Sequence, residues 1–380
     1  MNRDYIWNFN DEFISYLKST RANLNAMPEL GMQEYKTSAY IKNELDTMGY
    51  AYKSHIETSV AGMIKGSDPS KTIAFRADMD ALNSNNQIKH LCGHDGHMTI
   101  LLGLLNYIKT NKIIPKDNIV FIFQPAEEAP GGAQPMIENN LMTDYNIDEI
   151  YGLHIYPELK KGEIGCKKGP FLARICEIDV EILGKAAHGA APHKGKDAIL
   201  IASQFLNMVQ GIISREVSPI NPAVLTFGSI HGGSRRNIIC DKVNLEATLR
   251  VFSDEVYDFI KARVISIAKG LELAHNCTIT VNTNDDYPAV NNDEALYEQF
   301  KSLITSDESL KYVDLDYLMI SEDFSYYQKE VQGLFFMLGS QNEELGHIHG
   351  LHTHEFDFEP EVLLDGIDIF LKILKSKNVI

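Results

Sequence analysis

The sequence is short of cysteine, and it has no long apolar run. Its five cysteines are an odd number scattered over 380 residues, a usage typical of reduced intracellular proteins and not of a disulfide framework. No uninterrupted apolar stretch is long enough to cross a bilayer, and the N-terminal residues lack the apolar region of a secretory signal. We therefore expect a cytoplasmic protein without a membrane partner.

Positive charge is also scarce. The chain has 35 lysines and arginines against 52 aspartates and glutamates, which gives a formal net charge of -17. Binding to nucleic acid needs clustered Lys and Arg, so we expect no nucleic-acid partner. What remains is the composition of a globular protein, with 44% hydrophobic and 23% charged residues. Because 380 residues exceed one ordinary core, two domains are expected.

The first half of the chain alternates helix-like and strand-like segments. Apolar residues recur at helical spacing over residues 12–24, 37–48 and 97–108. Apolar runs at residues 72–75, 118–123 and 149–154 have the character of buried strands, and polar residues follow the first two. This order predicts an α/β fold, a mainly parallel sheet with helices on both faces.

The middle of the chain has a different pattern. It predicts strands at 176–183, 223–230, 243–251 and 278–282 and helices at 197–213 and 255–275. This β-α-β-β-α-β order is that of a ferredoxin-like α+β domain. We therefore predict an inserted domain at residues 173–285, within a catalytic domain made of residues 1–172 and 286–380.

Polar residues at the predicted strand ends suggest a metal site. Cys92 and His94 stand two apart at the start of a helix, and thiolate and imidazole are preferred ligands of zinc and related metals. Alone this pair is weak evidence, because most free cysteines are buried fillers. His97 lies one turn further on, where the helix carries it away, so we do not expect it to be a ligand.

Other strand ends strengthen the interpretation. Glu127 and Glu128 directly follow a buried strand, where adjacent carboxylates repel unless a cation neutralises them or water solvates them. His154 ends the next strand, although a histidine there is often a hydrogen-bonded core residue. Residues 346–354 hold four of the 13 histidines, and we expect at least one of these to point at the metals.

Seven short motifs occur in a characteristic order along nearly the whole chain. They are Arg76–Leu82, Cys92–His97, Phe123–Glu128, Gly152–His154, Ala187–His193, Ser321–Ser325 and Leu351–Thr353. In these motifs the chain resembles the amidohydrolase branch of the aminoacylase and carboxypeptidase metallopeptidases. That branch includes N-acyl-amino-acid hydrolases, hippurate hydrolases, auxin-conjugate hydrolases and N-acetyldiaminopimelate deacetylases.

The resemblance implies a site with two divalent metal ions per chain. Cys92 bridges the ions, His94 and His154 complete the ligands of one, and Glu128 and His352 complete those of the other. Zinc or manganese is expected first, and cobalt or nickel suits the same ligands.

The resemblance also implies roles for residues that do not bind metal. Glu127 acts as the general base toward a metal-activated water. Asp80 orients a ligand imidazole, and Asp78 is either structural or supports a metal ligand. His188 donates to the oxyanion, the alternative being an ordinary turn histidine. Asn237 and Arg236 are expected to contact the carboxylate end of the substrate. The inserted domain is expected to serve as a lid and to form a homodimer.

The predicted activity is hydrolysis of the amide bond of a small N-acyl amino acid. Residues 130–136 resemble the corresponding stretch of N-acetyldiaminopimelate deacetylases, which favours that substrate type. The alternatives are a dipeptidase or carboxypeptidase with the same site, and a binding protein that has lost catalysis. One departure from the family pattern is a shortened loop at residues 83–91, which puts the substrate specificity in doubt.

Overall fold

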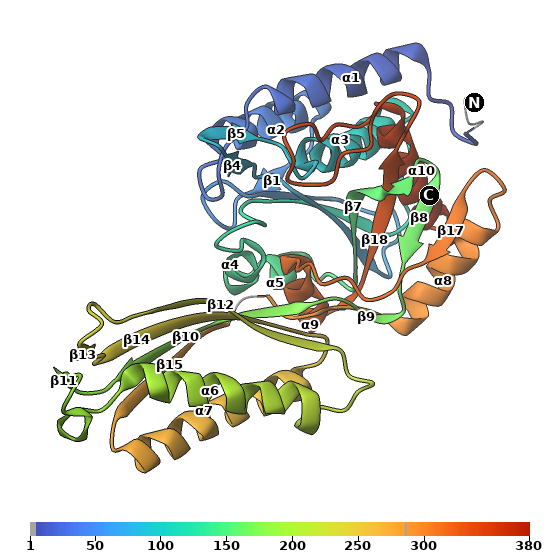
Figure 1. Ribbon diagram of the computed structural model, residues 1–380. Coiled ribbons are helices and arrows are strands. Elements are labelled where there is room, and N and C mark those ends of the chain that lie inside the picture. The colour runs from blue at the N-terminus through green and yellow to red at the C-terminus, as the bar shows by residue number, and fades with distance from the viewer. Residues whose placement is uncertain (1–4, 286) are drawn as a thin grey trace. The chain divides into compact units, whose positions relative to one another are not determined.

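The computed structural model describes residues 5–285 and 287–380, and these divide into two compact units (Figure 1). The first unit comprises the chain up to Phe171 together with Val290–Asp316 and Glu322–Ile380. The second comprises Leu172–Ala289 and Tyr317–Ser321. Its assignment as a lid and dimerisation domain stays a prediction.

The first unit is built on a sheet of eight strands in the order β1-β2-β6-β3-β7-β18-β8-β17. Their bounds are β1 Tyr52–Lys53, β2 Val60–Ile64, β3 Thr72–Asp78, β6 Asn118–Gln124, β7 Glu149–Lys160, β8 Glu163–Cys166, β17 Lys311–Asp314 and β18 Gln332–Gln341. The central strands β6, β3, β7 and β18 run parallel, as do β8 and β17, whereas β1-β2, β2-β6 and β18-β8 are antiparallel. The predicted mainly parallel sheet is confirmed.

Strand β3 shows why this sheet is covered on both faces. All seven of its residues are buried, and successive side chains point to opposite faces. Phe75 packs against Phe370, with 4.6 Å between the ring centroids, on the face that carries helix α10, Glu361–Ser376. Arg76 points the other way and contacts the short helix η3, Asp323–Tyr326.

Helix α3, His94–Thr110, is the central helix on the face of the sheet that carries α10. It packs against α1, Asp11–Asn25, α2, Tyr35–Met48, and α10 (Figure 1). Fourteen of its residues are buried, in agreement with the apolar pattern of the sequence. The remaining elements of the unit are α4 Ala133–Glu138, α5 Leu141–Tyr145, α8 Glu294–Thr305, α9 Tyr327–Glu330, β4 Leu82–Ser84, β5 Gln87–Lys89, β9 Gly169–Leu172 and β16 Val290–Asn292.

Two elements differ from the sequence prediction at the places that matter for the site. Helix α3 begins at His94 and not at His97, because Gly93 has a φ of 87° and turns the chain directly into the helix. Strand β7 continues to Lys160, so the prediction that His154 ends a strand was wrong. The strand is longer because β18 pairs with it as far as Gln341 opposite Lys160.

The second unit has the predicted β-α-β-β-α-β order. Its antiparallel sheet has the order β12-β14-β10-β15, formed by β10 Arg174–Leu183, β12 Ala223–Gly232, β14 Lys242–Val251 and β15 Thr278–Asp285. Helices α6, Ala198–Gly211, and α7, Asp254–His275, close its core. The short elements are β11 Ala187–His188, η1 Pro192–Lys194, η2 Ile212–Glu216 and β13 Ile238–Ile239. Among the described residues, no helix is both long and apolar enough to span a bilayer.

Candidate metal centre

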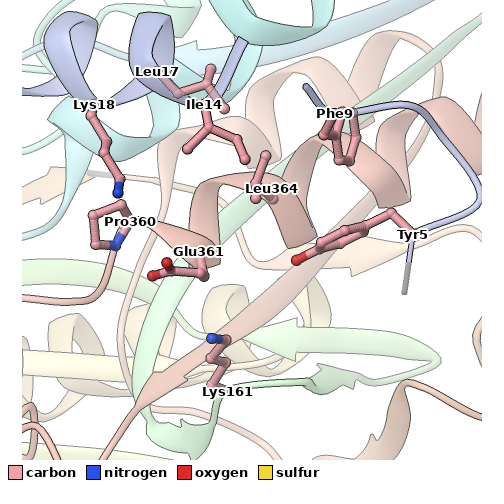
Figure 2. A pocket seen from close by; sticks show the side chains of 9 residues that line it. All are labelled: Tyr5, Phe9, Ile14, Leu17, Lys18, Lys161, Pro360, Glu361 and Leu364. Atoms are coloured by element: carbon pink, nitrogen blue, oxygen red, sulfur yellow. The ribbon is translucent and has the colours of Figure 1, made fainter. Parts of the chain in front are cut away.

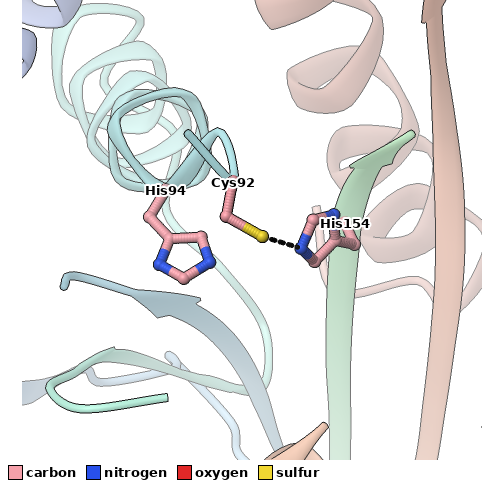
Figure 3. A group of neighbouring side chains, drawn as sticks. All are labelled: Cys92, His94 and His154. Atoms are coloured by element: carbon pink, nitrogen blue, oxygen red, sulfur yellow. Dashed lines mark hydrogen bonds between the residues drawn. The ribbon is translucent and has the colours of Figure 1, made fainter. Parts of the chain in front are cut away.

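The thiol of Cys92 lies at the centre of the predicted ligands in the first unit. Its sulfur is 3.3 Å from Nε2 of His154 and 3.2 Å from Nε2 of His352. Oε1 of Glu128 is 3.2 Å from the same nitrogen of His352. Figure 3 shows the Cys92 sulfur pointing to the His154 ring, with the His94 ring beside it. Four separate segments therefore converge on one point.

These side chains form two overlapping groups that share Cys92. One contains Cys92, His94 and His154, and the other contains Cys92, Glu128 and His352; within each group the ligand atoms all lie within 4.8 Å of one another. On a tetrahedral zinc ion, sulfur and nitrogen ligands are roughly 3.5 Å apart, given bonds of about 2.3 and 2.0 Å. The observed sulfur–nitrogen distances of 3.2 and 3.3 Å are close to that value, so these residues fit a pair of cations.

Hydrogen bonds assign the tautomers of two of the imidazoles. Nδ1 of His94 lies 3.0 Å from the carbonyl oxygen of Asp80, and Nδ1 of His154 lies 2.8 Å from that of Ile155. A carbonyl only accepts, so each Nδ1 donates, and in the neutral ring each Nε2 then keeps a lone pair for a cation. Among the described residues, the buried Nε2 of His94 has no hydrogen-bond partner. Burying a polar nitrogen without a partner costs free energy unless a ligand binds to its lone pair.

Asp80 joins the two sides of the site. Its two carboxylate oxygens accept from the backbone N–H groups of Glu127 and Glu128, both at 3.0 Å. Oδ1 also lies 3.3 Å from Nδ1 of His94. Asp80 therefore sets the loop that carries Glu127 and Glu128 relative to the first turn of α3.

A buried carboxylate that sequence reasoning missed supports the same loop. Oε1 of Glu34 accepts from the backbone N–H of Ala126 at 2.8 Å, and Oε2 accepts from Thr58 at 2.8 Å. Ala126 has a φ of 57°, a left-handed conformation that persists only where neighbours hold it. Burial raises the pKa of Glu34 to about 7. No local pattern marks Glu34, because its partners are far away in the sequence.

The site carries an excess of negative charge. Burial, and then the nearby carboxylates of Glu128 and Glu127, raise the pKa of the Cys92 thiol well above its usual range. Burial, followed by Glu322 and Glu128, raises the pKa of Glu127 in the same way. Burial opposes protonation of His94, but Asp78 and Asp80 outweigh it and raise the pKa of this imidazole to about 10. Cations are what such a buried cluster of acids needs.

A buried arginine, Arg76, holds three carboxylates together beside the site. Arg76 contacts Asp78 at 2.6 Å, Glu322 at 2.9 Å and Asp323 at 2.8 Å. Asp323 in turn accepts from the backbone N–H groups of Gly132 and Ala133, at 2.9 and 3.0 Å. The network therefore fixes the far end of the loop that carries Glu127 and Glu128. An arginine inside an apolar strand is the sequence signal that could have found it.

The remaining predicted residues lie in the second unit. His188 is exposed on β11 and pairs with Ile238 of β13. The N–H of Gly189 donates to the carbonyl of Asn237 at 2.8 Å, so His188 and Asn237 lie close together. Arg236 is exposed beside Asn237. The roles assigned to these three side chains stay predictions.

The site is distinct from a small cavity under the N-terminal segment. That cavity measures about 220 Å³ (Figure 2). Its wall combines apolar side chains, among them Phe9, Ile14, Leu17 and Leu364, with charged ones such as Lys161. None of its lining residues is a predicted ligand or catalytic group.

Residues 74–376 match the model of a family described as peptidase family M20/M25/M40. Similar sequences include N-acetyldiaminopimelate deacetylases from two bacteria. That of Listeria monocytogenes serovar 1/2a is 36% identical over 97% of this chain and 100% of its own length. That of Bacillus cytotoxicus is 39% identical over 96% and 99%.

Two solved structures are similar over 98% of this chain and the whole of their own. A protein from methicillin resistant Staphylococcus aureus has a TM-score of 0.89 at 30% identity. A dinuclear metal binding peptidase from Bacillus subtilis has a TM-score of 0.83 at 25% identity.

Proposed function

The chain belongs to peptidase family M20/M25/M40, and from this premise we propose that it deacylates a small N-acyl amino acid, with N-acetyldiaminopimelate as the first candidate. The family and the enzyme class predicted from the sequence, a metal-dependent hydrolase of amide bonds, are confirmed. The substrate is the proposal. It is supported by the two deacetylases, which match over nearly their full length.

One observation carries the proposed chemistry: a carboxylate that completes neither ligand triad lies beside both of them. Oε2 of Glu127 is 3.9 Å from Nε2 of His94, and Glu127 directly precedes Glu128. A protein that only bound the substrate would need no such base. Glu127 is therefore the group placed to move protons.

The proposed metal ligands follow the two triads. Cys92, His94 and His154 hold one ion, and Cys92, Glu128 and His352 hold the other. Zinc or manganese is proposed first, because thiolate and imidazole ligands suit zinc and carboxylate ligands suit manganese. When bound, the pair supplies a lowered pKa for the attacking water and polarisation of the amide carbonyl.

Glu127 carries the proton through the reaction. Its carboxylate takes a proton from the attacking water as the water oxygen bonds to the carbonyl carbon. The same proton then goes to the amide nitrogen as the carbon–nitrogen bond breaks, which yields a carboxylic acid and a free amine. The acid then gives its remaining proton to the amine or to solvent, which leaves a carboxylate. Asp80 keeps Glu127 in place through the hydrogen bond from the Glu127 backbone N–H.

The second unit supplies the proposed substrate contacts. His188 donates to the developing oxyanion, and Asn237 and Arg236 receive the substrate carboxylate. Their shared position on and beside the β11–β13 pair supports a joint role. A homodimer formed through this unit and a cytoplasmic location complete the proposal.

A substrate panel with defined metals tests the proposal. Protein stripped with a chelator is reloaded with zinc, manganese, cobalt or nickel and offered N-acetyldiaminopimelate, other N-acetyl amino acids and dipeptides. We expect amine release from the N-acetyl compounds and little from the dipeptides. Faster cleavage of the dipeptides would assign a peptidase instead, and no amine from any compound would overturn the proposal.

The variant Glu127→Ala tests the assigned base. We expect turnover to fall by about 10²- to 10⁴-fold, with both ions retained in elemental analysis. Glu127→Gln, which keeps the shape of the side chain, should be equally inactive. Loss of an ion with turnover retained would contradict the assignment.

A further inference from the structure

His97 is a buried histidine beside the metal centre for which the proposed mechanism has no use. Its side chain is 2% exposed. Its ring centroid lies 4.7 Å from that of His154 and 5.4 Å from that of His94. The ligand atoms of His97, His94 and Asp78 also lie within 4.8 Å of one another, so proximity alone would permit a third metal site.

The hydrogen bonds of His97 decide against a ligand role. Its Nδ1 is 2.7 Å from Oδ1 of Asp78, and its Nε2 accepts from the backbone N–H of Ile155 at 2.9 Å. Because an N–H must donate, Nε2 of His97 is the unprotonated nitrogen and its lone pair is taken. Nδ1 then carries the proton and donates it to Asp78. No lone pair remains for a cation.

The bond to Ile155 lies next to a metal ligand. Strand β7 pairs with β3 only as far as Arg76 opposite Gly152, so β7 runs beyond its neighbour. A buried backbone N–H past that point needs another partner, and His97 provides it. The carbonyl oxygen of Ile155 accepts from Nδ1 of His154 at 2.8 Å.

These hydrogen bonds form a continuous chain from Arg76 to the proposed metal ligand His154. Arg76 donates to Asp78 at 2.6 Å, and His97 donates to the other oxygen of Asp78. His97 then accepts from Ile155, which accepts from His154. Each bond is buried and fixes the next group in turn.

We propose that His97 is a positioning residue that fixes Ile155, and through it the ring of His154, so that Nε2 of His154 faces the ion bound with Cys92 and His94. This inference rests on the proposed pair of ions. Groups that orient a ligand in this way affect metal affinity or activity by about 10- to 100-fold when they are lost. The effect should fall on the His154 ion, because the ligands Glu128 and His352 of the other ion make no contact in this chain of bonds.

The test compares His97→Phe, which keeps the ring but removes both hydrogen bonds, with His97→Gln, which keeps one donor and one acceptor. Metal-stripped protein is titrated with cobalt, and the two dissociation constants and the visible spectrum are recorded. We expect His97→Phe to lower the affinity for one of the two cobalt ions by about 10- to 100-fold and to leave the affinity for the other unchanged. His97→Gln should recover much of the loss, and turnover should follow the occupancy of the weakened ion.

A matched control is His55→Phe. His55 is also buried in the first unit, and its Nε2 lies 3.1 Å from Asp144, away from the ligands. This variant should keep both cobalt affinities and the spectrum. Equal weakening in His55→Phe would show that losing any buried histidine is enough, and would overturn the proposal.

A measurement on the unmodified chain covers the case in which His97→Phe does not fold. In protein with ¹⁵N-labelled histidine loaded with ¹¹³Cd, Nε2 of His94 and of His154 should couple to cadmium, and His97 should show the Nδ1–H tautomer without coupling. A cadmium coupling at His97 would make it a ligand and overturn the proposal.

The outcomes separate this inference from the proposed function. A wild-type protein that holds fewer than two ions overturns the proposed function and this inference together. A wild type with two ions and a His97→Phe variant with the same two affinities overturns the inference alone.

Discussion

Replacing Arg76 by methionine should destabilise the first unit strongly. The guanidinium lies within 2.9 Å of the carboxylates of Asp78, Glu322 and Asp323, and none of the four side chains is more than 2% exposed. Methionine keeps most of the side-chain volume and removes the only cation among these four groups. The carboxylates then stay buried without their partner.

The size of the loss can be bounded from two directions. Removing one partner of a buried ion pair typically costs about 3–5 kcal/mol. A carboxyl group can also escape by taking a proton, and for Asp78 at pH 7 that costs about 4 kcal/mol, since each pH unit above its ordinary pKa is worth about 1.4 kcal/mol. Both routes give a loss of about 3–5 kcal/mol in the free energy of unfolding, a large part of a typical total of about 5–15 kcal/mol.

The sign of the pH dependence follows from the second route. In the variant the folded state holds a proton that the unfolded state has released, so the loss grows as the pH rises above about 4. It should increase by about 1.4 kcal/mol per pH unit for each carboxyl group that becomes protonated. Arg76→Lys should give a smaller loss, because it keeps the charge but not the planar fork of donors.

The single tryptophan makes the assay specific for the first unit. A chain with two units need not unfold in one step, but Trp7 belongs to the first unit and packs 6.2 Å from the ring of Tyr107. Its fluorescence during urea denaturation at pH 6 and pH 8 gives the two free energies. The control is Lys311→Met, which removes an exposed ion pair with Glu163 and should cost at most about 1 kcal/mol. A loss below about 1 kcal/mol for Arg76→Met, or one independent of pH, would refute the reasoning.

Two further predictions concern the ligands and the loop beside them. Cys92→Ser should lower the affinity for both ions by more than about 100-fold, whereas His154→Ala should lower the affinity for one ion, because Cys92 belongs to both triads. The metal content after dialysis measures these losses. Equal losses in the two variants would contradict a bridging thiolate. Burial raises the folded pKa of Glu34 from 4.5 to about 7, so its contribution to stability is complete below about pH 4.5 and is lost as the pH rises through 7, by about 3 kcal/mol. Urea denaturation of metal-free protein at pH 5 and pH 8 should show that Glu34→Gln lacks this part of the slope, and a slope equal to that of the wild type would exclude Glu34 as its source.

Local apolar patterns were enough to predict the elements of the fold, because helices and buried strands have distinct periods. Their ends depend on contacts that the local pattern does not contain. The extension of β7 past His154 is produced by β18, which is almost two hundred residues away in the sequence. The start of α3 depends on the left-handed conformation of Gly93, which the residue type permits but does not require.

How well each site residue could be predicted depends on how strongly its type and its spacing from other residues indicate metal binding. A thiol and an imidazole two residues apart are weak evidence for a metal when taken alone, and His154 and His352 each have an ordinary structural alternative. Family resemblance, and not spacing, selected these two from the 13 histidines of the chain. The supporting groups Glu34 and Arg76 escaped notice as functional residues because their partners are distant in sequence, at Ala126 and Asp323.

The end of strand β3 explains how one short segment can support both proposed ligand triads. Asp78 is the last residue of the strand, and Asp80 follows two residues later. Asp78 holds His97 and thereby the strand that carries His154, whereas Asp80 holds the backbone of Glu127 and Glu128. Asp78 therefore serves the triad of His154, whereas Asp80 serves both triads, because it also contacts Nδ1 of His94. Both carboxylates are attached to the same backbone segment. In the proposed site, the backbone that carries His154, Glu127 and Glu128 is therefore fixed by the end of β3 and not by the flexible side chains of the ligands.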